Sequence, residues 1–172
     1  MKLETNRLEI VALDEYYLKL ITEDISRFEK ELNCEYCGEE MKGIILQIFK
    51  NQIEVVKQNR DNYIWHTFWL FKLKSENKFI GSACFKNISY KDAQAEIGYG
   101  INTEFENQGY TTEAVDAMCK WALSKANIAK IIAETEIDNI PSQRVLKKCN
   151  MRIFKETEGC YWWELCSKSE YV

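Results

Sequence analysis

The alternation of apolar and polar residues along the chain predicts a mixture of strands and helices. Seven segments have the β-branched, aromatic or alternating composition of strands, namely residues 3–13, 63–73, 79–87, 96–101, 130–137, 153–157 and 161–167. Apolar residues at helical spacing predict four helices, over residues 15–22, over residues 39–58, from a start near residues 109–112, and from Pro141 to Cys149. This order of elements indicates an α+β protein.

The stretch Ala95–Ala126 is the one around which we expect the rest of the chain to be organised. Its strand contains Gly98 and Gly100, which suggests a bulge or a close approach of another group to the backbone. The helix that follows starts near Gly109, and main-chain N–H groups at a helix start favour a negative charge. This junction of strand and helix is therefore predicted to hold an anion such as a phosphate.

Composition and charge narrow the classes of function. The 172 residues are 46% hydrophobic and 29% charged, which predicts one soluble domain over residues 1–172 with a sizeable core. A formal net charge of −4 argues against broad nucleic-acid binding, because phosphates require a basic surface. No apolar run approaches the roughly 20 residues that span a bilayer, and the first residues lack a signal peptide's apolar centre. We therefore expect a cytoplasmic protein that binds neither nucleic acid nor membrane.

The cysteines and the single histidine suggest little chemistry of their own. The chain has seven cysteines, and without a secretion signal reduced thiols are expected rather than disulfides. Cys34 and Cys37 form one Cys-x-x-Cys pair with no second pair or nearby histidine, whereas structural zinc has four ligands. No metal is predicted. His66 lies in an aromatic run, which favours a packed strand residue over a catalytic base.

The predicted anion site carries a motif that resembles a known family. The run Gly109–Ala114 (Gly-Tyr-Thr-Thr-Glu-Ala), after a predicted strand, resembles the acyl-CoA-binding motif of the GNAT superfamily of N-acetyltransferases. The resemblance is closer to the ribosomal-protein N-terminal acetyltransferase (RimJ/RimL-like) branch. The family pattern is Gln or Arg, two residues, Gly, one residue, then Gly or Ala, and here it spans Glu106–Thr111. Gly109 matches this pattern, whereas Glu106 and Thr111 depart from it.

The segment Asn139–Met151 carries a second resemblance to the same superfamily. It is similar to the family's Asn-x-x-Ser opening and the helix that follows, with Asn139 and Ser142 at the two named positions. Many relatives have a tyrosine on this helix that protonates the departing thiolate, and the aligned residue here is Leu146. In the RimJ/RimL-like branch the serine is the usual candidate for that role, which points to Ser142.

The order of elements fits the superfamily over nearly the full length, and the resemblance implies its fold and cofactor. That fold is α+β with α/β/α layers. Its central sheet is mixed and mostly antiparallel, with about seven strands and four helices, and is splayed between the fourth and fifth strands. The implied cofactor is acetyl-CoA, without a metal. Pantetheine would contact the backbone of the strand and an asparagine side chain, and main-chain N–H groups would hold the pyrophosphate. The implied residues are Tyr99, Ile101, Asn107, Gln108, Gly109, Tyr110, Thr111 and Asn139.

Acetyl transfer from a thioester to an amine needs a proton acceptor for the amine and a proton donor for the thiolate. We expect Glu96 to accept the amine's proton, directly or through water, because an acidic residue at this position often does so in the family; a structural carboxylate is the alternative. Ser142 is the candidate donor, with a simple helix cap as the alternative. If Ser142 is not the proton donor, Tyr110 and Tyr161 are the next candidates for that role. No covalent enzyme intermediate is needed.

The predicted function is acetyl-CoA-dependent acetylation of a primary amine by direct transfer in a ternary complex. An aromatic-rich hairpin beside an acidic surface suits a protein N-terminus, a polyamine or an aminoglycoside equally well. A non-catalytic CoA-binding or regulatory module on the same fold is the alternative, motivated by Glu106, Thr111 and Leu146. A structural domain that binds no CoA is a third possibility. The protein is expected to be a monomer or a homodimer.

Overall fold

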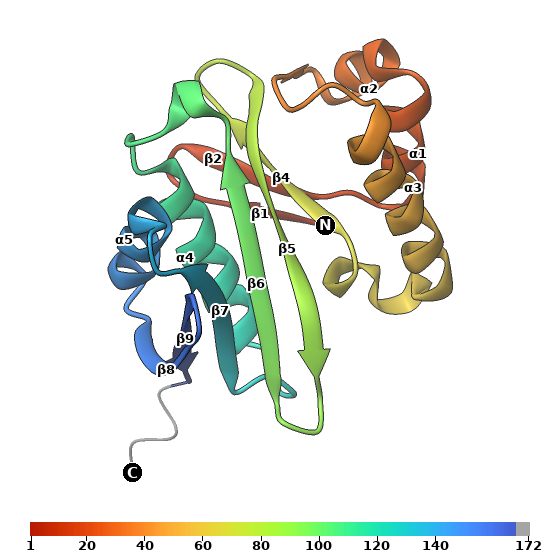
Figure 1. The fold of residues 1–172 in the computed structure, drawn as a ribbon. Coiled ribbons are helices and arrows are strands. Elements are labelled where there is room, and N and C mark those ends of the chain that lie inside the picture. The colour runs from red at the N-terminus through yellow and green to blue at the C-terminus, as the bar shows by residue number, and fades with distance from the viewer. Residues whose placement is uncertain (168–172) are drawn as a thin grey trace. The chain divides into compact units, whose positions relative to one another are not determined.

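The computed structural model describes residues 1–167, and the chain divides into two compact units (Figure 1). The first unit comprises Met1–Cys84 and Tyr99–Tyr110, and the second comprises Phe85–Gly98 and Thr111–Val172. The expectation of one domain over the whole chain stays a prediction. Within the described part of the chain, no helix is long and apolar enough to cross a membrane.

The first unit is built on antiparallel strands. These are β1 (Lys2–Glu4), β2 (Leu8–Ala12), β4 (Phe68–Leu73) and the first part of β5 (Lys78–Ser89), hydrogen-bonded in this order. The short β3 (Glu35–Tyr36) pairs in parallel with β5, and the last residues of β6 (Gln94–Ile101) also belong to this unit. Alternate residues of β2 are buried, as a strand with one face on the core requires: Leu8, Ile10 and Ala12.

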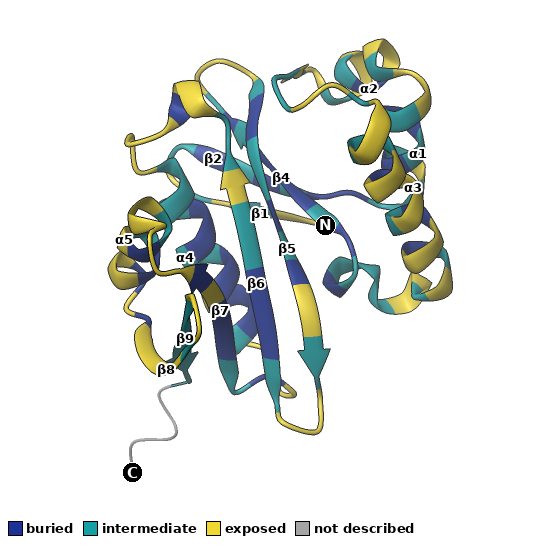
Figure 2. Cartoon of the chain, in the orientation of Figure 1, coloured by how far each residue is buried: buried dark blue, intermediate teal, exposed yellow. Residues whose placement is uncertain are grey.

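Helices complete the core of the first unit. They are α1 (Glu15–Glu23), α2 (Ile25–Leu32), α3 (Gly43–Gln58) and the 3₁₀ turns η1 (Arg60–Trp65) and η2 (Thr103–Phe105). Asp14 starts α1, since its side chain accepts the Tyr17 N–H at 2.9 Å. Leu18, Phe28 and Ile53 from the three α-helices share one apolar cluster with residues of β4 and β5. Figure 2 shows buried and exposed residues alternating along these helices.

The second unit combines strands with two α-helices. Its elements are α4 (Tyr110–Leu123), β7 (Lys130–Glu136), α5 (Ile140–Lys148), β8 (Arg152–Thr157) and β9 (Cys160–Cys166). The strand order is β6-β7-β9-β8, in which only β6 and β7 are parallel. Their registered pairs end at Glu96 and Ile132, which is consistent with the predicted splay. Trp163 is buried and donates its indole N–H to Thr135 Oγ1 at 2.9 Å.

The predicted α+β class with a mixed, mostly antiparallel sheet is confirmed, although the element count differs. The described residues contain nine strands and five α-helices, against about seven and four expected. The extra helix, α2, was not predicted, although Ile25, Phe28 and Leu32 lie at helical spacing in its eight residues. The expected first strand is a hairpin of β1 and β2, because Thr5 and Leu8 close a turn between them.

Two predicted boundaries were wrong. Residues 63–65, expected as the start of a strand, belong to η1, and the Trp69 indole N–H donates to the Ile64 carbonyl at 2.9 Å. His66 follows η1 and is not a strand residue. Helix α3 begins at Gly43 rather than at Glu39, because the residues before it form a loop held by a bond from Cys37 N–H to Phe79 O at 3.2 Å. The loop matters below because it lines a cavity.

Candidate active site

The turn that leads from β6 into α4 has the conformation expected of an anion site. Asn107 and Gly109 have φ angles of 59° and 82°, in the left-handed region that favours asparagine and glycine. Gly109 directly precedes α4 and has no side chain with which to cap it. The first N–H groups of any α-helix lack an intrahelical partner. Asn107, Gln108 and Gly109 are exposed and Tyr110 is half-buried, so this turn can donate main-chain hydrogen bonds to an anion.

Arg7 lies beside this turn, a position that could not be inferred from the sequence. Its Nη1 donates to the Gln108 carbonyl at 3.0 Å, and its guanidinium lies 4.3 Å from the centroid of the Tyr110 ring. A Cβ on Gly109 would be 3.4 Å from Arg7 Nη2. Arg7 therefore adds a positive charge to the start of α4 and holds the carbonyl side of the turn.

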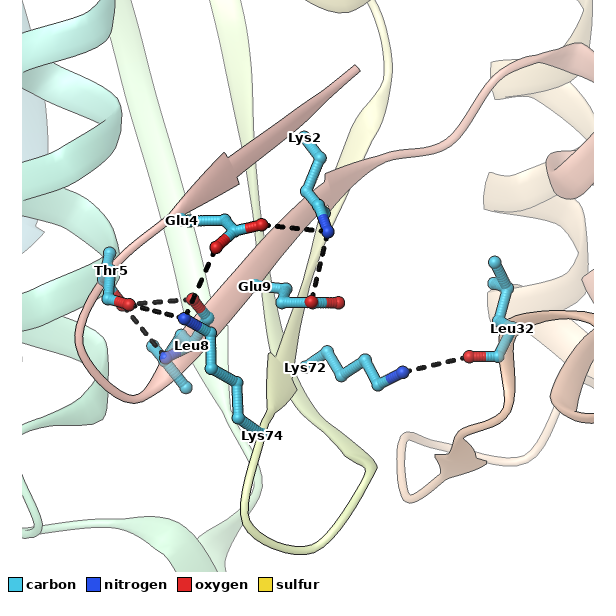
Figure 3. A network of polar contacts seen from close by, with 8 residues as sticks. All are labelled: Lys2, Glu4, Thr5, Leu8, Glu9, Leu32, Lys72 and Lys74. Carbon is cyan, nitrogen blue, oxygen red and sulfur yellow. Dashed lines mark hydrogen bonds and ion pairs between the residues drawn. The ribbon is translucent and has the colours of Figure 1, made fainter.

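A polar network fixes the hairpin that carries Arg7 (Figure 3). Lys74 Nζ donates to the Thr5 carbonyl at 2.7 Å, and the Lys74 N–H donates to the Arg7 carbonyl at 3.0 Å. The Leu8 N–H donates to Thr5 Oγ1 at 3.0 Å, which closes the turn. Lys2 pairs with Glu9 at 3.1 Å across the two strands. Because the backbone around Arg7 is held by these hydrogen bonds, the Cα of Arg7 has a defined position relative to the turn before α4.

Glu96, the predicted proton acceptor, is a buried carboxylate with two polar neighbours in the second unit. Its side chain is 6% exposed. Asn87 Nδ2 donates to Oε2 at 2.6 Å, and Lys86 Nζ lies 3.5 Å from Oε1. A Cβ on Gly98 would lie 2.5 Å from Lys86 Cε, so glycine there leaves room for the lysine chain. A carboxylate in this setting can accept a proton, and it is oriented by its neighbours.

The start of α5 is capped by the side chain of Asn139, the residue that precedes the helix. Asn139 Oδ1 accepts the Ser142 N–H at 3.1 Å, and a proline lies in the first turn. The Asn139 amide nitrogen remains on an exposed residue, and Ser142 is half-buried. Leu146, aligned with the tyrosine of many relatives, is fully buried. Cys149 Sγ lies 3.6 Å from the Thr112 carbonyl and joins the end of α5 to the first turn of α4.

The predicted site residues thus fall into two sets. The first unit holds six of the predicted cofactor residues, at the end of β6 and the start of α4. Tyr99 and Ile101 are half-buried on the strand, and the other four are Asn107, Gln108, Gly109 and Tyr110. The second unit holds Glu96, Thr111, Asn139 and Ser142.

The first unit also contains a cavity of about 290 Å³ beside the end of β6. Gly100 and Ile101 line it, together with residues of β4, β5, α3 and the loop after β3. The sequence did not predict this cavity, because it is assembled from segments far apart in the chain.

The thiols and the histidine do not form a metal-binding cluster among the described residues. No group of three or more His, Cys, Asp or Glu side chains in that part of the chain is placed to hold a metal ion. Burial raises the pKa of Cys34 to about 12, so this thiol stays protonated and is a poor nucleophile. Partial burial lowers the pKa of His66, and the pocket residues above do not include it.

The anion-binding turn fits the phosphates of an acyl-CoA. Its donors are main-chain N–H groups on a glycine-containing turn at a helix start, with one arginine beside them. Glu106 is exposed at the edge of the turn, and its side chain can extend into water. A turn of this kind between a strand and a helix can hold a phosphate-bearing ligand.

Comparison with known proteins agrees with this assignment. The profile of the acetyltransferase (GNAT) domain family matches residues 7–152. N-acetyltransferase YjdG of Bacillus subtilis (strain 168) is 27% identical over 161 residues, which cover 93% of this chain and 95% of that protein. The family match spans most of the sequence. The chain therefore belongs to the GNAT acetyltransferase family, and it is an enzyme of the acyltransferase class.

Solved structures show the same fold. The ribosomal-protein-S5-alanine acetyltransferase of Vibrio fischeri superposes with a TM-score of 0.71 at 14% identity, covering 98% of this chain and 97% of that one. The ribosomal L7/L12 α-N-protein acetyltransferase in complex with coenzyme A gives 0.67 at 15% identity, covering 96% and 98%. Both are ribosomal-protein acetyltransferases, the branch that the two motifs resemble. At these identities the likeness establishes the fold.

Proposed function

We propose that this chain is an acetyl-CoA-dependent N-acetyltransferase that transfers the acetyl group directly to a primary amine within a ternary complex. The observation that carries the proposal is the start of α4. There Gly109 is left-handed, the helix lacks a side-chain cap from that residue, and Arg7 lies at the turn. The acceptor is a protein N-terminal amine or a small amine. We further propose that the protein acts in the cytoplasm, as a monomer or a homodimer.

In this proposal the cofactor is held mainly by main-chain groups. The N–H groups of residues 107–111 would bind the pyrophosphate, and Arg7 would add positive charge beside it. The backbone of Tyr99 and Ile101 would line the pantetheine, and the exposed amide of Asn139 would donate to it. When bound, acetyl-CoA supplies the acetyl group as a thioester. Because these contacts use the backbone, Thr111 is compatible with the site although it departs from the family pattern.

Two side chains would move protons. Glu96 would take the proton from the attacking amine, directly or through a water molecule, with Asn87 and Lys86 holding the carboxylate in place. Ser142 Oγ would give a proton to the departing sulfur. Its main-chain N–H already serves the cap of α5, so the hydroxyl is not needed for that purpose. Leu146 is apolar and buried, and therefore takes no part in proton transfer.

The experiment that tests the proposal is turnover of an amine panel by the wild type and by Glu96→Gln. Products should be detected by mass spectrometry, because the partly exposed thiols of Cys37, Cys84, Cys160 and Cys166 would react with thiol reagents. We expect kcat to fall about 10²- to 10⁴-fold in Glu96→Gln, with unchanged acetyl-CoA affinity. Glu164→Gln is the matched control, since Glu164 is also shielded, with 13% side-chain exposure, and ion-paired to Arg152 at 3.0 Å.

The outcomes distinguish the proton-acceptor role of Glu96 from the acetyltransferase activity itself. Wild-type turnover and an unchanged pH profile in Glu96→Gln would remove the proton-acceptor role while the acetyltransferase proposal stands. Cofactor binding without acetylation of any amine would instead support a non-catalytic CoA-binding module on this fold.

A further inference from the structure

The cavity of the first unit adjoins the strand end that the proposed function assigns to pantetheine. Gly100 and Ile101 of β6 line it, and Ile101 is one of the residues proposed to contact the cofactor. A Cβ on Gly81 would lie 2.5 Å from the Gly100 carbonyl oxygen, so glycine at position 81 lets β5 and β6 approach closely. A Cβ on Gly100 would meet nothing within 4 Å. The cavity therefore has free space directly over the backbone of β6.

Aromatic and aliphatic side chains make up most of the cavity wall. Four aromatic rings line it, from Tyr36, Phe49, Phe68 and Phe79. The Phe49 and Phe68 rings lie 4.8 Å apart between centroids and are tilted by 46°. Ile48 of α3 also lines the cavity and remains 44% exposed, so an apolar side chain stands at its solvent-facing side.

The cavity is lined by one negatively charged side chain. Glu39 is the one charged side chain among the described residues that line it, and the other polar groups there are neutral. Glu39 belongs to the loop before α3. That loop is tied to the sheet, because the Asn102 side chain donates to the Cys37 carbonyl and the Cys37 N–H donates to the Phe79 carbonyl at 3.2 Å. The carboxylate is thus carried by an anchored segment at the edge of an aromatic cavity.

We propose that this cavity selects acceptors with one ammonium group on an aromatic or branched apolar body, either free monoamines or peptides with such a first residue. The inference rests on the proposed function. Glu39 attracts the ammonium group during binding, and the rings take up the apolar body and attract the cation. At about 290 Å³ the volume lies at the low end for ligand cavities, which suits one small amine or one residue.

Polyamines fit this cavity poorly. A polyamine carries several positive charges along its length, whereas the lining offers one carboxylate. The remaining ammonium groups would lose water on entering the cavity and would find no second carboxylate there, which is unfavourable. A peptide that begins with alanine or serine leaves the four rings without an apolar partner and gains less from burial.

The reaction balances without a further reactant. The amine nitrogen forms a bond to the acetyl carbon, the carbon–sulfur bond breaks, and CoA leaves as the thiol. The bound ammonium group loses one proton to become the attacking amine and a second as the amide forms; one proton reaches the sulfur and one is released to water, so the product is a neutral N-acetyl amide.

The test compares acceptors that share a primary amine and differ in the body. The panel is 2-phenylethylamine, a tripeptide with N-terminal phenylalanine, ethanolamine, a tripeptide with N-terminal serine, and spermidine. We expect kcat/KM for one or both aromatic acceptors to exceed the others at least about tenfold, the effect of burying an aromatic ring. Whichever aromatic acceptor is faster identifies the source, a free amine or a peptide, and either result supports the inference.

Two matched pairs of variants test the cavity itself. Ile48→Ser removes an apolar wall residue, and Ile44→Ser makes the same change one turn earlier on α3, where Ile44 is 75% exposed and outside the lining. Glu39→Gln removes the charge, and Glu40→Gln is its control, because Glu40 pairs with Lys42 and does not line the cavity. We expect KM for 2-phenylethylamine to rise about 5- to 10-fold in Ile48→Ser and Glu39→Gln only, with unchanged acetyl-CoA affinity.

Each outcome decides the inference separately from the proposed function. Preference for spermidine, ethanolamine or the serine peptide overturns it and leaves the acetyltransferase proposal intact, and so do equal effects in Ile48→Ser and Ile44→Ser. If no amine is acetylated, the proposed function fails, and calorimetric titration with 2-phenylethylamine then decides. Binding that Ile48→Ser weakens and Ile44→Ser does not would support the cavity, and no binding would overturn it.

Discussion

The starts of α4 and α5 are two helix N-termini that the chain treats in opposite ways. At α5 the Asn139 side chain accepts the Ser142 N–H at 3.1 Å, and Pro141 has no N–H to satisfy. At α4 the preceding residue is Gly109, which has no side chain, and Arg7 donates to the turn from another part of the first unit.

The helix dipole is common to both starts, so it does not explain the difference. What differs is whether the chain itself satisfies the free N–H groups. A capped start leaves little for an external anion, and it places its side chains in defined positions. A start that follows a glycine, with an arginine beside it, has no cap from the preceding side chain and can offer main-chain donors to a ligand. This difference is the reason why the proposed function places phosphate binding at α4 and gives Asn139 and Ser142 of α5 their proposed roles.

The largest effect should follow a negative charge placed at the start of α4. Gly109→Asp puts a carboxylate beside the proposed phosphate site, near Arg7. Repulsion at about 4 Å in a partly exposed site is worth about 4 kcal/mol, so acetyl-CoA affinity should fall on the order of 10²- to 10³-fold by calorimetry. Gly159→Asp is the control, because Gly159 has the same φ of 82° in a different turn. Equal losses in both variants would show that backbone strain, not the site, is responsible.

The next effect concerns the hydroxyl at the start of α5. Ser142→Ala keeps the main-chain N–H that Asn139 accepts, so this cap of α5 should not change. At saturating acetyl-CoA, kcat should fall about 10- to 100-fold if the hydroxyl protonates the departing sulfur. Unchanged kcat would leave Ser142 with the cap alone and would turn attention to Tyr110 and Tyr161.

A smaller effect is expected at Arg7. Arg7→Ala removes the positive charge beside the turn and the bond to the Gln108 carbonyl, so acetyl-CoA affinity should fall about tenfold. The difference from wild type should shrink as salt is raised, because screening weakens charge interactions. Lys2→Ala, in the same hairpin, should bind the cofactor as the wild type does. A loss of the same size in Lys2→Ala would mean that the hairpin, not Arg7, supports the site.

The smallest effect should be the loss of the α5 cap. Asn139→Ala should lower the free energy of unfolding by about 1 kcal/mol and weaken acetyl-CoA binding a few-fold if the amide contacts pantetheine. Asp14→Ala removes the equivalent cap of α1, where Asp14 accepts the Tyr17 N–H at 2.9 Å. Both variants should lose similar stability in chemical denaturation. Only Asn139→Ala should lose affinity, and identical affinities would reduce Asn139 to a cap.

Features set by neighbouring residues could be predicted from the sequence. The α5 start follows from Asn139 and Pro141, and Asn150 ends this helix region with a φ of 61°, as its residue type favours. The turn at Gly109 was predicted for the same reason, because glycine readily adopts the left-handed conformation that such a turn uses. The two family motifs lie in these same segments, Glu106–Thr111 and Asn139–Met151.

Features that need distant residues could not be predicted. Arg7 reaches a residue 101 positions away, and one sequence contains no sign of such a pairing. Glu96 was predicted, but its contacts with Lys86 and Asn87 depend on the register of β5 and β6. The aromatic cavity combines the loop after β3 with α3 and three strands. Residues 63–65 were predicted as strand but belong to a 3₁₀ turn, because an aromatic composition suits both structures.

The most direct test of the central claim is thermal unfolding of the wild type with and without excess acetyl-CoA. If α4 starts at a cofactor site, ligand at about 100 times its dissociation constant should add roughly 2.7 kcal/mol of stability and raise Tm clearly. The rise should be lost in Gly109→Asp and kept in Gly159→Asp. No shift in the wild type at millimolar acetyl-CoA would contradict the account, because the uncapped helix start would then bind no cofactor.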